Sequence, residues 1–264
     1  RQSGSITPGH PEWGHTPGVD TTTGPLGQGF ATGIGMAIAE AQLSDTFNKH
    51  DFDIIDHYTY AIVTDGDLME GISSEAASLA GTLELGKLIY LYDSNRITIE
   101  GSTDLAFTED VAKRFEAFNW HVQIVENGND VDAIDQAIEI AKLDPRPSLI
   151  ICKTVIGYGL PTRANTPGIH GTPAGWDELN LAKENAKWPT EPLFYTPENV
   201  LKHFRESILK GNEKQKHWEE QFEAYKEQYP ELAQEFLRRF SGELPEDWSQ
   251  NLPQFEADEK GMAT

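Results

Sequence analysis

Residues 60–101 constrain the fold more than any other stretch of this chain. They begin with an apolar run at 60–63, the pattern of a strand buried in a parallel sheet. An acidic turn and a helix follow, and a second apolar strand at 88–92 ends in another polar turn. A crossover of this length makes the two strands parallel neighbours, so both turns lie at the carboxyl edge of one sheet. Open α/β sheets bind their ligands at that edge.

Two oxygen-bearing side chains follow these strands. Asp65 comes after the first strand and Asn95 comes after the second, about thirty residues later. Gly66 allows a tight turn, and the helix expected over 68–83 presents unpaired N–H groups that suit a diphosphate. Mg²⁺ takes about six oxygens, usually few from protein and the rest from phosphate and water. The spacing therefore allows a magnesium–diphosphate site, although Asp and Asn are also ordinary turn residues.

Strands and helices continue to alternate through most of the chain. The expected helices cover 30–43, 108–119 and 131–142, and the expected strands cover 120–125 and 148–152. This order predicts an α/β fold with a doubly wound, mainly parallel sheet and helices on both faces. Towards the C-terminus the periodicity becomes helical and charged, which predicts a helical connector. An apolar stripe within it is expected to be core: Trp218, Phe222 and Tyr225.

The charge and the cysteine content limit the classes of function. The formal net charge of −22 argues against a nucleic-acid partner, which needs a basic footprint. No apolar run approaches the roughly twenty residues of a membrane span, and no signal peptide is visible, so a cytoplasmic location is expected. The single cysteine, Cys152, cannot form an intramolecular disulfide and is expected to be a buried strand residue. The chain opens without methionine and looks like a piece of something longer.

Residues 1–29 are rich in Gly, Pro, Thr and His and predict a long loop before the first helix. Long loops inside compact domains are usually functional or disordered. Two interpretations fit its cluster of His10, Glu12 and His15. One is a transition-metal site, although a proline-containing loop fixes no helical ligand face. The other is a polar site that faces a substrate.

Several of these runs together resemble the transketolase family. They are GHPE and TTGPLGQG near the start, DGDLMEGISSEAASLAG and YDSNRITIEG in the centre, and the IGYG and HG pair at 156–171. Thr64 stands where the family motif usually has glycine, a change that leaves the expected ligands intact. The resemblance covers essentially all 264 residues.

The resemblance implies thiamine diphosphate as cofactor, held with Mg²⁺ for which Ca²⁺ can substitute. The metal ligands that it implies are Asp65, Asn95 and the carbonyl of Ile97. The cofactor-binding residues that it implies are Gly24, Leu26, Asp65, Gly66, Asn95, Ile99, Ile156 and His170. The residues expected to orient substrate or move protons are His10 and His170. Two acidic residues are expected at a subunit interface near the cofactor, Glu70 and Glu75.

The activity that the resemblance implies is transfer of a two-carbon ketol unit from a ketose phosphate to an aldose phosphate, in the pentose phosphate pathway. Residues 1–190 are expected to be a diphosphate-binding domain without its first segment, and 191–264 a helical extension and linker. The expected partners are sugar phosphates and the pyrimidine-binding domain of a partner subunit in a homodimer. The chain alone is then an inactive half-site. The alternatives are a non-catalytic subunit of a split thiamine enzyme, a proteolytic fragment of the full enzyme, or another thiamine enzyme such as a deoxyxylulose-phosphate synthase or a ketoacid dehydrogenase component.

Overall fold

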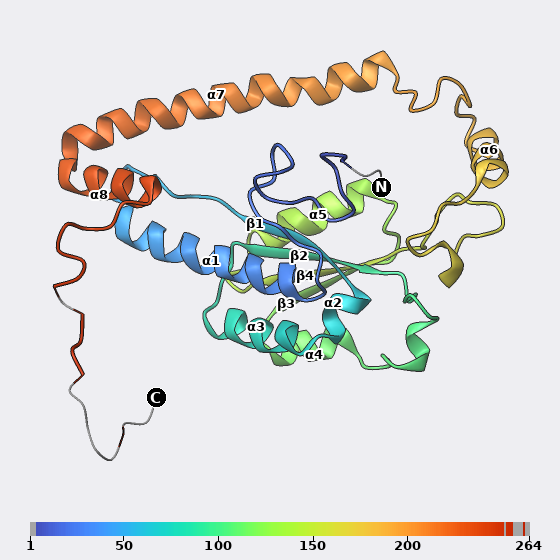
Figure 1. Cartoon of the computed structure of the whole chain (residues 1–264), viewed down its shortest axis with the longest axis horizontal. Helices are drawn as coiled ribbons and strands as arrows, with labels where there is room; N and C mark the ends of the chain where they lie inside the picture. The colour runs from blue at the N-terminus through green and yellow to red at the C-terminus, as the bar shows by residue number, and fades with distance from the viewer. Residues whose placement is uncertain (1–3, 251, 256–260, 262–264) are drawn as a thin grey trace. The chain divides into compact units, whose positions relative to one another are not determined.

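The computed structural model describes residues 4–250, 252–255 and 261 (Figure 1). The last part of the expected linker, at 256–260 and 262–264, lies outside the described residues. The chain divides into two compact units, which are described separately. The first unit comprises Arg1–Leu43 and Asp56–Lys202, and the second comprises Ser44–Ile55 and His203–Thr264.

A four-stranded sheet forms the centre of the first unit. Its strands are β1 (Thr59–Thr64), β2 (Leu88–Ser94), β3 (His121–Val125) and β4 (Ser148–Lys153). All pairings are parallel, and the order across the sheet is β1-β2-β4-β3. Thr64 lies opposite Asp93 in the register of β1 and β2. The prediction that these two strands are parallel neighbours is therefore confirmed, and their carboxyl ends meet at one edge.

Helices cover both faces of this sheet, as predicted (Figure 1). Residues of α1 (Gln28–Phe47), α3 (Gly71–Thr82) and α4 (Val111–Ala117) share one apolar cluster with one face of the strands. The opposite face packs on α5 (Val131–Ala141), whose Ala137 and Ala141 join the cluster of Ile89 and Ile150. The remaining elements of this unit are α2 (Asp65–Met69), η1 (Thr103–Leu105), η2 (Pro167–Ile169) and α6 (Trp176–Asn185).

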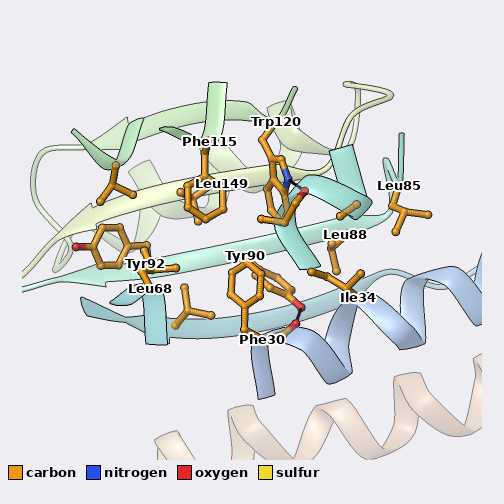
Figure 2. Packing of buried hydrophobic residues seen from close by; sticks show 14 of the residues in the cluster. Phe30, Ile34, Leu68, Leu85, Leu88, Tyr90, Tyr92, Phe115, Trp120 and Leu149 are labelled. Carbon is orange, nitrogen blue, oxygen red and sulfur yellow. Dashed lines mark hydrogen bonds between the residues drawn. The ribbon is translucent and has the colours of Figure 1, made fainter. Parts of the chain in front are cut away.

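Two of the aromatic residues in the larger apolar cluster, Tyr90 and Trp120, donate hydrogen bonds to main-chain carbonyl oxygens (Figure 2). The Tyr90 hydroxyl donates to the carbonyl oxygen of Phe30 at 2.6 Å, and the indole N–H of Trp120 donates to that of Ala77 at 2.8 Å. Buried polar groups that lack partners are costly, so these bonds make aromatic packing possible here. A Cβ on Gly33 would come within 2.3 Å of the Tyr90 hydroxyl oxygen, so α1 approaches β2 this closely only through a glycine.

The expected helix over 68–83 and the turn before it differ from the structure. Helix α2 begins at Asp65 itself, and Glu70, in an extended conformation at φ −72° and ψ 137°, separates α2 from α3. The Ser73 hydroxyl donates to the carbonyl oxygen of Asp67 at 2.5 Å, which favours a break in the helical ladder here. The helix expected over 108–119 is also shorter, because the side chain of Asp110 caps α4 by accepting the N–H of Lys113 at 3.1 Å.

The second unit is helical and contains most of α7 (Glu198–Gln228) and α8 (Pro230–Ser241). Phe222 and Tyr225 of the predicted stripe are buried, and the Tyr225 hydroxyl donates to the Phe47 carbonyl oxygen at 2.7 Å. The half-buried Trp218 donates to the Ile54 carbonyl oxygen at 3.0 Å. The prediction that this stripe is core is confirmed. None of the helices in the described part of the chain is long and apolar enough to cross a membrane.

Candidate functional site

A cavity of about 890 Å³ opens at the carboxyl edge of the sheet. The segments that follow β1, β2 and β4 all contribute to its wall. The wall includes most of the residues that the sequence singled out: Leu26, Asp65, Gly66, Asn95, Ile97, Ile99, Ile156 and His170. Parallel strand ends converge at this edge, which explains why residues about a hundred positions apart share one cavity.

Asp65 is the most strongly constrained polar group of the cavity, with only 3% of its surface exposed. The Tyr92 hydroxyl donates to its Oδ1 atom. Its Oδ2 atom is buried and has no hydrogen-bond partner of good geometry among the described residues. Burial raises the pKa of the Asp65 carboxyl, and the Tyr92 hydroxyl and the nearby N–H of Arg96 lower it in part. A buried carboxylate oxygen without a partner is costly, so this atom fits a bound cation.

Asn95 stands at the end of β2 in the same wall. Its Oδ1 atom accepts the N–H of Ile97 at 2.9 Å, which folds the chain back sharply and leaves one lone pair on that oxygen. The bond from the Thr98 N–H to the Gly101 carbonyl oxygen, at 2.7 Å, then closes a tight turn. One carboxylate, one amide oxygen and the main-chain oxygen of Ile97 make an all-oxygen set, which suits Mg²⁺ or Ca²⁺.

The transition-metal interpretation of His10, Glu12 and His15 is wrong. Within residues 4–250, 252–255 and 261, no group of three or more His, Cys, Asp or Glu side chains is placed to hold a metal. The set expected from Asp65, Asn95 and the Ile97 carbonyl is of a different kind, because two of those three oxygens are neutral.

His10 and Gly24 lie outside the lining of the main cavity. The exposed imidazole of His10 covers Gly24, where a Cβ would be 2.4 Å from its Nδ1 atom. Gly24 instead lines a second hollow of about 470 Å³ beside β1, and that hollow shares Leu26, Ile62 and Thr64 with the main cavity. The structure thus brings His170, but not His10, to the main cavity.

Gly66 is important for a reason other than the expected tight turn. It lies inside α2, and a Cβ there would be 3.2 Å from both terminal methyl groups of Leu26. The small residue therefore lets Leu26 pack on the segment that carries Asp65. Because α2 has only five residues, its N-terminus is a weaker anion site than a long helix would offer.

Asp67 is a functional candidate that the sequence analysis missed. Its Oδ1 atom accepts the N–H of Gly27 at 3.0 Å, and its Oδ2 atom accepts both the N–H and the hydroxyl of Thr64 at 2.9 Å. It thereby joins the GPLGQG loop to the end of β1. The sequence did contain a sign of this role. Asp67 follows Asp65 by two positions, but the expected metal motif uses only the side chains of Asp65 and Asn95, which leaves Asp67 without a role.

Two further polar residues of the cavity wall, Asp93 and Thr154, were also missed. The Thr154 hydroxyl, after β4, donates to Asp93 at the end of β2, and this bond links two strand ends at the cavity wall.

Glu70 also lines the cavity and is exposed, whereas Glu75 is exposed on α3. Their expected place at a subunit interface stays a prediction.

Comparison with known proteins agrees with this geometry. The family model for the transketolase thiamine diphosphate binding domain matches residues 1–245. The chain is 54% identical to the transketolase of Bacillus subtilis over 97% of its length and 53% identical to that of Geobacillus stearothermophilus over 100%. It spans only 39% and 40% of the length of these two relatives.

Solved structures give the same result. The transketolase of Leishmania mexicana superposes with a TM-score of 0.93 at 43% identity, covering 97% of this chain and 38% of that one. A Pichia stipitis transketolase in complex with sedoheptulose-7-phosphate superposes with a TM-score of 0.92 at 46% identity, covering 96% of this chain and 38% of that one. Sequence, fold and the arrangement of the strand-end residues therefore lead to one conclusion: this chain belongs to the transketolase family and matches the part of it that binds thiamine diphosphate.

Proposed function

We propose that this chain is the diphosphate- and Mg²⁺-binding part of a transketolase, an enzyme that moves a two-carbon ketol unit from a ketose phosphate to an aldose phosphate in the pentose phosphate pathway. The observation that carries the proposal is the Asp65 carboxylate. Tyr92 donates to one of its oxygens, and the other is buried without a hydrogen-bond partner among the described residues, in the cavity wall that also contains Asn95.

The residues of this chain have separate tasks in the proposed reaction. Thiamine diphosphate, when bound, supplies an electron sink for breaking the bond next to the ketose carbonyl. Asp65, Asn95 and the Ile97 carbonyl would hold the metal ion, whose charge would neutralise the diphosphate. The apolar side chains of Leu26, Ile99 and Ile156 line the cavity and exclude water around the cofactor.

His170 is the proposed contact of this chain with the diphosphate and the substrate side. It lies at the cavity wall and is exposed, so a bound ligand can reach its imidazole. An imidazole can donate or accept a proton near neutral pH, as an orienting or proton-moving group must. His10 keeps its proposed role of orienting substrate or moving protons, and its exposed ring lies against Gly24, which lines the second hollow.

The proposed partners complete the site. A pyrimidine-binding domain of a partner subunit in a homodimer would enclose the cofactor, and sugar phosphates would be the substrates. The solved complex with sedoheptulose-7-phosphate in a related transketolase supports this substrate class. The family match sets aside a deoxyxylulose-phosphate synthase or a ketoacid dehydrogenase component. A natural split subunit remains an outcome of the test, and a cytoplasmic location remains an expectation.

Calorimetric titration of the chain with thiamine diphosphate tests the proposal directly. We expect binding that requires Mg²⁺, or Ca²⁺ in its place, and that weakens by at least about 100-fold in Asp65→Asn, since even outer-shell changes at metal sites cost about 10–100-fold. Asp135→Asn, an exposed change on α5, is the matched control and leaves the affinity unchanged. Binding that needs neither the divalent ion nor Asp65 would contradict the proposal.

Ketol transfer is then measured for the chain alone and after mixing with a separately produced pyrimidine-binding half. Activity only in the mixture identifies a competent half-site. Robust turnover by the verified 264-residue chain alone would show that the half-site interpretation is wrong.

A further inference from the structure

The segment that carries His170 is folded around a single arginine. Two atoms of the Arg163 guanidinium hold it: Nη1 donates to the carbonyl oxygens of Pro173 and Ala174 at 2.8 and 2.9 Å, and Nη2 donates to that of Gly168 at 2.6 Å. Nη2 also lies 3.5 Å from the Thr172 hydroxyl oxygen. The guanidinium thus contacts the chain both before and after His170, within what we call the 163–174 loop.

These bonds exclude the obvious alternative for Arg163. An arginine beside a site for phosphorylated ligands would normally be suspected of binding phosphate. Here both terminal nitrogens already donate to main-chain carbonyl oxygens, so they are not available to donate to a phosphate. Its geometry is that of an internal support for the loop.

A second group anchors the beginning of the same loop. Glu178, in the first turn of α6, is only 9% exposed. Its Oε1 atom accepts the N–H groups of Thr162 and Arg163 at 2.7 and 3.0 Å, and its Oε2 atom accepts the Thr162 hydroxyl at 2.9 Å. The N–H of Thr162 in particular lowers the pKa of the Glu178 carboxyl, so this carboxylate stays ionised at neutral pH.

The loop is closed against the cavity wall by shorter-range contacts. The Asn165 N–H donates to the Ile156 carbonyl oxygen at 2.9 Å, and the His170 N–H donates to that of Pro167 at 2.9 Å. A Cβ on Gly157 would be 3.3 Å from Ile169. Ile156, Gly157, Ile169 and His170 all line the main cavity, so the internal bonds of the loop decide where the imidazole stands.

The geometry points to Arg163 and Glu178 as positioning residues, which hold the 163–174 loop and thereby fix His170 at the wall of the cofactor cavity. Neither is a catalytic residue, because their polar atoms are turned into the loop itself. The consequence for cofactor binding depends on the proposed function, whereas the ordering of the loop does not.

Hydrogen exchange of the whole chain, read by mass spectrometry, tests the ordering. In Arg163→Gln we expect amides of the 163–174 loop to exchange at least about tenfold faster, since hydrogen bonds to a charged group are lost. Amides of β2 and β4 serve as the internal reference and stay protected. Arg163→Lys restores part of the protection, because an ammonium keeps the charge but cannot span the same fork of acceptors. Unchanged exchange of the loop in Arg163→Gln would overturn the inference.

Glu178 is tested in the same way with two variants and a matched control. Glu178→Ala leaves the N–H groups of Thr162 and Arg163 without an acceptor, and the loop exchanges faster. Glu178→Gln keeps one carbonyl acceptor, so we expect its loop amides to exchange at a rate between those of Glu178→Ala and the wild type. Glu184→Gln, an exposed change on the same helix, behaves like the wild type. Equal exchange in Glu178→Ala and Glu184→Gln would show that Glu178 does not hold the loop.

The effect on His170 is read from its imidazole resonances by NMR, with and without thiamine diphosphate and Mg²⁺. In the wild type we expect one sharp Cε1–H signal that shifts when the cofactor binds, and in Arg163→Gln a broadened signal that shifts less. A sharp signal in Arg163→Gln with the wild-type shift would overturn the inference. If the cofactor does not bind the wild type at all, the proposed function fails, while the exchange and the line width without cofactor still decide the role of Arg163.

Discussion

The imidazole of His10 occupies the space that any side chain on Gly24 would need. A Cβ at that position would come within 2.4 Å of Nδ1 and 2.8 Å of Cε1, and the φ of Gly24, +151°, is one that other residues rarely adopt. The two residues are therefore fitted to each other, fourteen positions apart in a loop that has no helix or strand.

Gly24→Ala tests this fit. We expect the methyl group to displace the His10 ring and to strain the loop, at a cost of about 1–3 kcal/mol in the free energy of unfolding, measured by denaturant titration. Gly35→Ala is the control, because a Cβ there meets nothing within 4 Å and the change should stabilise α1 by about 0.5–1 kcal/mol. Equal effects of the two changes would contradict the close fit.

Asp67→Asn tests the joint between the GPLGQG loop and the end of β1. The amide NH₂ group would face either the N–H of Gly27 or that of Thr64, so at least one of the three bonds to Asp67 is lost. Bonds to a charged acceptor contribute about 1.5–3 kcal/mol, and we expect unfolding to become easier by an amount in that range. Asp135→Asn should stay within about 0.5 kcal/mol of the wild type, and an equal loss in both variants would argue against a joint.

Gly81→Ala tests the packing of α3. A Cβ at Gly81 would lie 1.7 Å from the Phe118 carbonyl oxygen, which belongs to the main chain and cannot turn away. We expect the free energy of unfolding to fall by about 3 kcal/mol or more, measured as a fall in thermal midpoint. Gly71→Ala, at the start of the same helix, meets nothing within 4 Å and should change stability little, so a larger fall in Gly71→Ala would be inconsistent with the packing.

Asp144 gives a pH dependence with a definite sign. Hydrogen bonds from the Arg146 side chain lower the pKa of the Asp144 carboxyl from 3.8 to about 2. Because this pKa is lowered in the folded state, the ionised carboxyl stabilises the fold at a pH above its ordinary pKa of 3.8. The stabilisation is lost as the pH falls towards 2. After screening by solvent, we expect Asp144→Asn to cost about 1 kcal/mol at pH 7 and almost nothing near pH 2, in urea titrations at both pH values. A cost that does not change with pH would mean that packing, and not charge, is responsible.

The sheet and most of the cavity wall were predictable, because they depend on strong local patterns. The apolar runs ending at Val63 and Tyr92 are short and strand-like, and each is followed by a polar residue that could only stand at the carboxyl edge. Residues from β1, β2 and β4 accordingly converge in one cavity. The apolar stripe that includes Phe222 and Tyr225 was predictable for the same reason, since helical spacing specifies one face.

What escaped prediction depends on bonds between distant segments. The helix breaks at Glu70, where the Ser73 hydroxyl donates to the carbonyl oxygen of Asp67. Sequence spacing does not show whether a serine hydroxyl turns towards the main chain in this way. The displacement of His10 from the main cavity follows from its fit to Gly24. Nothing in the sequence distinguishes Arg163, and only the folded loop shows that its guanidinium donates to main-chain carbonyl oxygens.

Cys152 stands in the wall of the main cavity, 5% exposed, and it is the only thiol in all 264 residues. The chain therefore carries a built-in attachment point for a fluorine label or a thiol-reactive dye. Burial, and then the neighbouring Asp93, raises the pKa of this thiol, which keeps it slow to react in the folded protein. The rate of labelling then reports how often this buried thiol becomes exposed, and the measurement needs no cysteine to be removed or introduced.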